Sequence, residues 1–149
     1  MIAFRFSLQK ALEWRGTQLE LAEAQVQQQL AALAYLDRQE LELQTMGRRT
    51  EVEVRALQPL SGADLAALGS FRALVKSQER ELARKRLEMR AELAKRQAAM
   101  LEARRRSRLL ERLKERRWAE WQAASDKELE ELAADSYLAR WTNLQHRLQ

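Results

Sequence analysis

The stretch Gln58–Ser70 reads Q-P-L-S-G-A-D-L-A-A-L-G-S and decides the fold, because it carries the one strong turn signal of the chain. It holds the only proline, Pro59, and two of the four glycines, Gly62 and Gly69. Both flanks are long runs of Ala, Leu, Glu, Gln, Lys and Arg, the residues with the highest helix propensity. Since proline removes a backbone donor and clashes with the preceding turn, a first helix is expected to end near Leu57.

A second helix is expected to begin directly after this turn. Ser61 is followed three residues later by Asp64, just ahead of Leu65 and Leu68, which is the pattern of an N-cap with an acidic residue in the first turn. The prediction is a single all-α unit over residues 1–149, with a helix over about 7–57, a turn over about 58–64 and a helix over about 65–142. The fold class is a long two-helix antiparallel coiled-coil hairpin whose second helix is the longer one.

Heptad patterns support the pairing of the two helices. In the first helix the a and d positions carry Leu12, Leu19, Val26, Leu33 and Val54, and Leu8, Ala22, Leu36, Leu43 and Leu57. This pattern weakens around Glu40, Gly47 and Thr50, so looser packing is expected there. Ser7 is the expected N-cap, with Phe6 as a hydrophobic staple.

The second helix has one good apolar column and one poor column. Its d positions are Leu68, Val75, Leu82, Met89, Arg96, Ala103 and Leu110, whereas charged residues occupy much of the a column. Phe71 lies off the d column and has less reason to be buried. With a turn near residue 60, antiparallel partners have numbers that add up to about 120, so the helix beyond about Arg117 is expected to lack an intramolecular partner. That overhang carries Trp118, Trp121, Tyr137 and Trp141. The alternative is that Phe4 and Phe6 fold over Trp118 or Trp121, or that the tail bends back as a third short helix.

Composition excludes several classes of protein. The chain has 33% charged residues, 6% aromatic residues, no cysteine and one histidine, His146, so disulfides, thiolate metal sites and zinc sites are not expected. It has no signal-peptide pattern and no apolar run long enough for a membrane helix. Phosphate-binding loops and catalytic motifs are missing as well, so neither enzyme activity nor a cofactor is expected.

Positive charge is concentrated in one segment. Residues 72–117 hold 17 basic and 7 acidic residues, a net charge of +10, whereas residues 118–149 hold 3 basic and 6 acidic, a net charge of −3. The basic stripe comprises Arg84, Lys85, Arg86, Arg104, Arg105, Arg106, Arg108 and Arg112. Such a stripe can bind nucleic-acid phosphates, but the acidic, aromatic sequence after Arg117 is unlike a basic zipper. A solvated helix face, or a surface that attracts an acidic protein, is the favoured interpretation.

Two segments carry a resemblance to a known family. The first is F-R-F-S-L-Q-K-A-L-E-W-R, Phe4 to Arg15; the second is L-L-E-R-L-K-E-R-R-W-A-E-W, Leu109 to Trp121, followed by D-K-E-L-E-E-L-A-A, Asp126 to Ala134. Both resemble segments of the flagellar export protein FliJ family. The resemblance implies a coiled coil similar to the central stalk subunit of rotary ATP synthases. It also implies a cytoplasmic component of the flagellar type III export apparatus, peripheral at the cytoplasmic face of the inner membrane and touching the membrane only indirectly.

The resemblance further implies the partners and their contact residues. Family members bind the centre of the hexameric export ATPase FliI, promote its assembly and activity, and contact the export gate protein FlhA and export chaperones. On this sequence the implied ATPase contact is Leu109, Leu110, Leu113, Arg116, Arg117, Trp118 and Trp121. The implied gate contact is Phe71, Val75 and Leu82, for which a plain coiled-coil seam is the alternative. The related protein of injectisome-type secretion is a variant of the same hypothesis.

Two other functions stay open at the level of sequence. A generic dimeric coiled-coil tether would pair its seams between chains and would leave an ATPase unaffected. A basic-helix nucleic-acid binder would lose affinity steeply with salt, although nucleic acid is not the expected partner.

Overall fold

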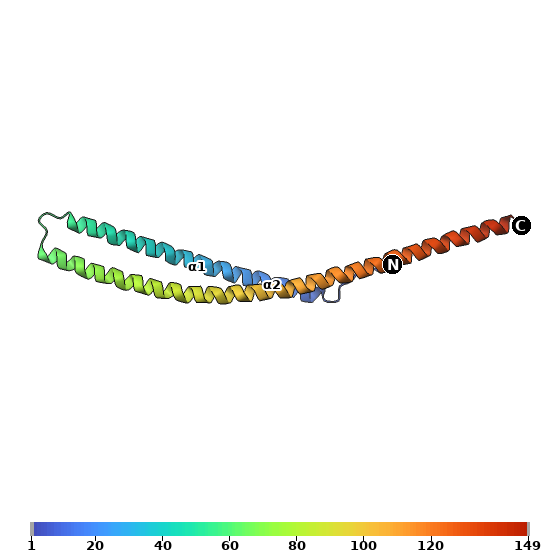
Figure 1. Ribbon diagram of the computed structural model, residues 1–149, viewed down its shortest axis with the longest axis horizontal. Helices are drawn as coiled ribbons and strands as arrows, with labels where there is room; N and C mark the ends of the chain where they lie inside the picture. The colour runs from blue at the N-terminus through green and yellow to red at the C-terminus, as the bar shows by residue number, and fades with distance from the viewer. Residues whose placement is uncertain (1, 149) are drawn as a thin grey trace. The chain divides into compact units, whose positions relative to one another are not determined.

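A computed structural model describes residues 2–148 as two long α-helices that pair antiparallel. Helix α1 spans Gln9–Arg55 and helix α2 spans Gly62–Arg147, 47 and 86 residues respectively. Figure 1 shows the two helices side by side, joined by one short connection. The predicted all-α hairpin with a longer second helix is therefore confirmed. Relative to the predicted bounds, α1 begins and ends two residues inside them, whereas α2 begins three residues earlier and ends five residues later.

The turn ends in the capping arrangement that the sequence predicted. The backbone N–H of Asp64 donates to Ser61 Oγ at 3.1 Å, and the backbone N–H of Ser61 donates to Asp64 Oδ2 at 3.0 Å. The Ser61 hydroxyl also donates to Asp64 Oδ2, at 2.7 Å. This reciprocal pair satisfies two backbone donors at the start of α2 and fixes where the helix begins.

Helix α1 starts slightly later than the predicted cap. Its first residue is Gln9, and the carbonyl of Leu8 accepts a hydrogen bond from the Leu12 N–H at 2.9 Å. Leu8, rather than Ser7, therefore holds the position before the helix, and Ser7 lies in the turn that precedes it. The Phe6 carbonyl accepts from the Gln9 N–H and closes that turn.

The chain divides into two compact units, one formed by Leu19–Ala103 and one by residues 2–18 with residues 104–148. In the Leu19–Ala103 unit the buried apolar side chains are Val26, Leu36, Leu43 and Leu68. These are a or d positions of the predicted heptads, and the other a and d residues of α1 between 19 and 54 are buried or half-buried. The predicted seam of α1 is thus confirmed in this unit.

The register of this unit is fixed by polar contacts across the seam. Gln29 Nε2 donates to the Met89 carbonyl at 2.9 Å, and Arg96 Nη1 donates to the Gln25 carbonyl at 3.2 Å. The paired residue numbers add up to about 120, as the position of the turn predicted. Arg86 forms ion pairs with Asp37 and Glu40. Arg86 occupies an a position of α2, so two carboxylates from α1 compensate a charged residue in the seam.

In the unit formed by residues 2–18 and 104–148, the seam is built from smaller and more polar residues. Ser107 is buried with 3% of its surface exposed, and Ser125 is buried as well. Leu12, Arg15 and Leu110 are half-buried. Within residues 2–148, neither helix contains an apolar segment that is long enough to cross a lipid bilayer.

Candidate protein-binding surfaces

A groove of about 660 Å³ lies between α1 and α2 in the Leu19–Ala103 unit, near the turn. Phe71 and Val75 of α2 are half-buried in it, and Gly47 of α1 faces Val75. A Cβ atom at Gly47 would lie 3.7 Å from Val75 Cγ1, an ordinary van der Waals distance, so the absence of a side chain there leaves space. The groove therefore has an apolar floor with room for a side chain from outside.

The rim of this groove is charged with both signs. It is lined by Arg48 and Glu51 from α1, and by Arg72, Lys76 and Glu79 from α2. Arg72 forms an ion pair with Glu51 across the two helices. Since this pair is solvent-exposed, it contributes little to stability, and a binding segment can exchange partners with it at small cost.

The three residues of the implied gate contact lie along the seam side of α2. Phe71 and Val75 line the groove just described. Leu82 lines a second groove of about 470 Å³, formed with α1 residues that include Leu43 and Met46. All three side chains are half-buried. Phe71, off the d column, is half-buried like Val75 in that column, and its neighbour Arg72 is exposed and paired with Glu51.

Groove formation near Gly47 follows from two sequence features. Gly47 and Thr50 occupy a and d positions of α1, where large apolar side chains would fill the space between the helices. Packing is therefore looser there, as the sequence predicted. Gly69 lines the same groove from α2, with open space where its Cβ atom would be. Two glycines on facing helices were a readable signal for a groove, although α1 itself stays helical throughout.

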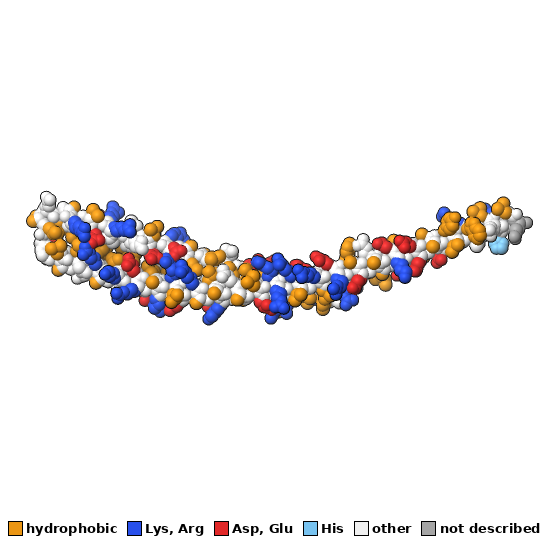
Figure 2. Space-filling view, in the orientation of Figure 1, with side chains coloured by type: hydrophobic (Ala, Val, Ile, Leu, Met, Phe, Trp, Pro, Cys, Tyr) orange, Lys and Arg blue, Asp and Glu red, His pale blue; other side chains and the backbone are white. Residues whose placement is uncertain are grey.

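The basic stripe is partly neutralised by carboxylates. Arg84 pairs with Glu81 at 2.6 Å and with Glu88 at 2.9 Å. The hydrogen bond from Arg84, together with its charge, lowers the pKa of Glu81, and the same contact raises the pKa of Arg84. Arg86 faces Asp37 and Glu40, and Arg104, Arg105 and Arg106 also have interaction partners. Figure 2 shows basic and acidic side chains mixed over parts of the visible face, together with one denser group of basic side chains. The part of the stripe around Arg84 and Arg86 is thus a mixed-charge surface.

A second surface forms where the N-terminal segment lies on α2, in the unit of residues 2–18 and 104–148. Trp121 Nε1 donates to the Ile2 carbonyl at 3.1 Å, and the rings of Phe4 and Trp121 lie 6.0 Å apart at 54°. A cleft of about 710 Å³ lies beside this contact and is lined by residues 2–7 together with Arg117, Glu120 and Trp121. The sequence allowed either exposure of this tryptophan or cover by Phe4 or Phe6, and the structure has the second arrangement.

The residues of the implied ATPase contact differ in exposure. Leu110, Leu113 and Trp121 are half-buried. Four members of the set are exposed: Leu109, Arg116, Arg117 and Trp118, with Trp118 48% exposed. Only the second group is directly available to a partner.

Beyond Ser125, α2 is exposed over its whole length to Arg147, and Leu148 after it is exposed as well. Large apolar side chains there include Leu129, Tyr137, Trp141 and Leu144, each at least half exposed. The predicted overhang is therefore confirmed from residue 126 onward, whereas the earlier boundary near Arg117 is wrong because the N-terminal segment covers Trp121 and its neighbours.

No group of three or more His, Cys, Asp or Glu side chains is arranged to hold a metal ion between residues 2 and 148. The surfaces described above are grooves and exposed helix faces of the kind that bind polypeptides. Comparison of the chain with protein-family models, with curated proteins and with solved structures gave no match.

Proposed function

We propose that this protein is a stalk-like component of the flagellar type III protein export apparatus, which binds the centre of the hexameric export ATPase FliI and promotes its assembly and activity. The main support for this proposal is that the two segments with the family resemblance contact each other in the structure. The two segments that resemble the FliJ family, Phe4–Arg15 and Leu109–Trp121, are more than 90 residues apart in sequence. They meet in one unit through the Phe4 and Trp121 rings and the hydrogen bond from Trp121 to the Ile2 carbonyl.

This meeting gives the resemblance a physical basis. Antiparallel pairing of α1 and α2 brings a chain's beginning next to the later part of its second helix. Arg117 lines the cleft at this contact, and Trp118 beside it is 48% exposed, so basic and aromatic character occur together there, as in protein-interface hot spots.

The groove near the turn is proposed to receive a segment of the export gate protein FlhA. Phe71 and Val75 supply its apolar floor, and Arg48, Arg72 and Lys76 supply basic rim groups. An extended or helical segment with an apolar residue flanked by acidic residues fits this chemistry. Export chaperones are proposed as further partners. In this proposal the protein acts as a binding partner rather than as an enzyme, in the cytoplasm at the inner membrane.

The test of the ATPase contact is size-exclusion chromatography with light scattering, on the protein alone and mixed with purified FliI, with ATP turnover measured in the same samples. The expected result is a hexamer-sized complex and increased turnover. Trp118→Ala and Arg117→Glu should reduce both effects at least tenfold. Arg80→Glu is the control, since Arg80 is exposed on the same helix outside this surface. An ATPase left unaffected by the wild-type protein would overturn the proposal and favour a tether.

The groove has a test of its own. Gly47→Ala places a methyl group against Val75 and narrows the groove, whereas the same substitution at Gly16 meets no atom within 4 Å. Both changes raise helix propensity equally. Gly47→Ala should therefore weaken FlhA binding while Gly16→Ala leaves it unchanged, both measured by isothermal titration calorimetry. Equal binding by the two variants would exclude this groove as the gate contact.

A further inference from the structure

The exposed end of α2 has a chemistry that the stalk proposal does not use. We define the tail stripe as Leu129, Ala133, Tyr137, Trp141 and Leu144, which follow one another at intervals of four, four, four and three residues. Residues at these intervals lie on one side of a helix. Tyr137 is 71% exposed, and Leu129, Trp141 and Leu144 are 50–59% exposed. Figure 2 shows hydrophobic side chains gathered toward the end of α2.

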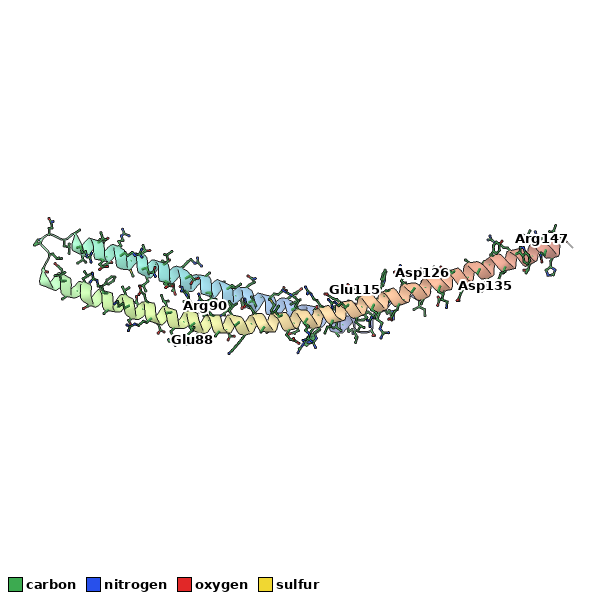
Figure 3. All side chains as sticks on the ribbon, viewed as in Figure 1. Glu88, Arg90, Glu115, Asp126, Asp135 and Arg147 are labelled. Atoms are coloured by element: carbon green, nitrogen blue, oxygen red, sulfur yellow. The ribbon has the colours of Figure 1, made fainter. Side chains whose placement is uncertain are left out.

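Charge along the same segment changes sign at its middle. Residues 126–135 contain five acidic residues and one lysine, a net charge of −4, whereas residues 136–148 contain Arg140 and Arg147 and no acidic residue, a net charge of +2. Asp126 and Asp135 are labelled along the first half in Figure 3, and Arg147 is labelled at the end of the second half. The midpoint of the segment falls at Ser136 and Tyr137.

We propose that residues 126–148 form an antiparallel pair with the same segment of a second copy, with the two tail stripes in contact. In that orientation the acidic half of each copy faces the basic half of the other. A parallel pair would instead place the two acidic halves, each with a net charge of −4, against each other. Charge complementarity thus selects both the occupant and its direction, since the segment is complementary to its own reversed copy and the pair has two-fold symmetry.

The apolar contact sets the expected strength. Covering the large exposed side chains of the stripe in both copies removes roughly 1,000 Å² of surface, close to the lower limit for specific protein interfaces. A dissociation constant on the order of tens of micromolar is therefore expected. The exposed Lys127–Glu131 pair, at 3.9 Å within one helix, is weak enough to rearrange in the dimer. This inference concerns a surface outside the ATPase contact and does not depend on the proposed function.

Analytical ultracentrifugation of the full chain from about 1 to 300 µM tests the association. Dimerisation in the range of tens of micromolar is expected for the wild-type protein. Trp141→Ala and the double variant Arg140→Glu/Arg147→Glu should each weaken it at least tenfold. The matched control, Arg80→Glu/Arg90→Glu, changes charge equally at exposed positions of the same helix and should leave it unchanged. A wild-type protein that stays monomeric throughout would overturn the inference and leave the tail stripe to another protein.

Exchanging the charges between the two halves of the segment provides an independent test of the antiparallel pairing. The variant Glu130→Lys/Glu131→Lys should also dimerise poorly, but mixing it with Arg140→Glu/Arg147→Glu should restore pairing, because the exchanged charges then face one another. Failure of the mixture to associate would contradict the charge argument. Far-UV circular dichroism of each variant checks that the helices are intact.

Direction is testable because the chain contains no cysteine. Pyrene attached through Ser136→Cys, at the midpoint, should give excimer fluorescence at dimer-forming concentrations. Pyrene attached through Gln145→Cys should not, since the two labels of an antiparallel pair lie about 25 Å apart along the helix axis. Excimer emission from the Gln145→Cys protein would show a parallel pair and overturn the proposed arrangement.

Discussion

Asp64 is a single residue whose ionisation is linked to the start of α2. Its carboxylate accepts from the Ser61 N–H and from the Ser61 hydroxyl, and these hydrogen bonds lower the pKa of Asp64, with the backbone bond as the larger cause. A carboxylate whose pKa is lower when folded stabilises the folded state above its unfolded pKa. That contribution is lost as the pH falls through the folded pKa.

The resulting prediction compares wild type with Asp64→Asn in thermal unfolding followed by circular dichroism. Wild type should be the more stable protein at pH 7, and the difference should shrink as the pH falls below the ordinary aspartate range near 3.9. Ser61→Ala removes the other half of the cap and should cost about 1 kcal/mol at pH 7. A difference between wild type and Asp64→Asn that persists at pH 2 would contradict the role of ionisation.

Gln29 is a polar residue at a d position, buried with 8% of its surface exposed. Its side-chain amide donates to the Met89 carbonyl at 2.9 Å, which favours one alignment of the helices. Replacing it with leucine loses a hydrogen bond of about 1 kcal/mol and gains apolar burial of about 2 kcal/mol. Gln29→Leu should thus stabilise the hairpin by about 1 kcal/mol in urea unfolding, and Gln29→Ala should not. Destabilisation by Gln29→Leu would show that the hydrogen bond outweighs burial.

At the scale of elements, the N-terminal segment depends on one side chain of α2. Trp121 both stacks with Phe4 and donates to the Ile2 carbonyl, so Trp121→Ala removes the two contacts that hold residues 2–7. We expect trypsin to cleave after Arg5 at least tenfold faster in this variant, measured by limited proteolysis with mass spectrometry. Trp118→Ala is the control, because Trp118 lies three residues earlier and is half exposed. Equal cleavage rates in both variants would exclude Trp121 as the anchor.

The two helices were predictable from sequence because their signals are local or periodic. Proline and the Ser61–Asp64 cap fix the turn, and heptad spacing fixes the face of α1 that contacts α2. The half-burial of Phe71 does not follow from its place off the d column, because a strict heptad column does not describe the groove that Phe71 lines with Gly47 and Gly69. The cover over Trp121 was left open because residues 2–7 have no periodic pattern, and their position depends on contacts more than 100 residues away.

At the scale of the whole molecule, stability is expected to vary along α2. Residues from Leu68 to Ser107 have buried or half-buried positions at heptad spacing, whereas residues 126–148 are exposed throughout. A helix without tertiary contacts gains only its marginal intrinsic stability and opens locally. The candidate binding surfaces follow the same division, since the grooves lie between paired helices and the tail stripe lies on an unpaired one.

Hydrogen exchange at two protein concentrations measures how stability varies along α2. It also separates the effect of pairing within one chain from the effect of pairing between two copies. Well below the expected dimerisation constant, at about 1 µM, amides of residues 126–147 should exchange at least a hundredfold faster than those of residues 79–103, because only the latter need inter-helix contacts to break. At about 200 µM the tail amides should slow at least severalfold, since self-pairing adds tertiary contacts to the same residues. Trp141→Ala should keep the first pattern and lose the second. A tail protected equally at both concentrations would mean that its helix is stabilised within one chain, which would contradict the exposure of its apolar side chains.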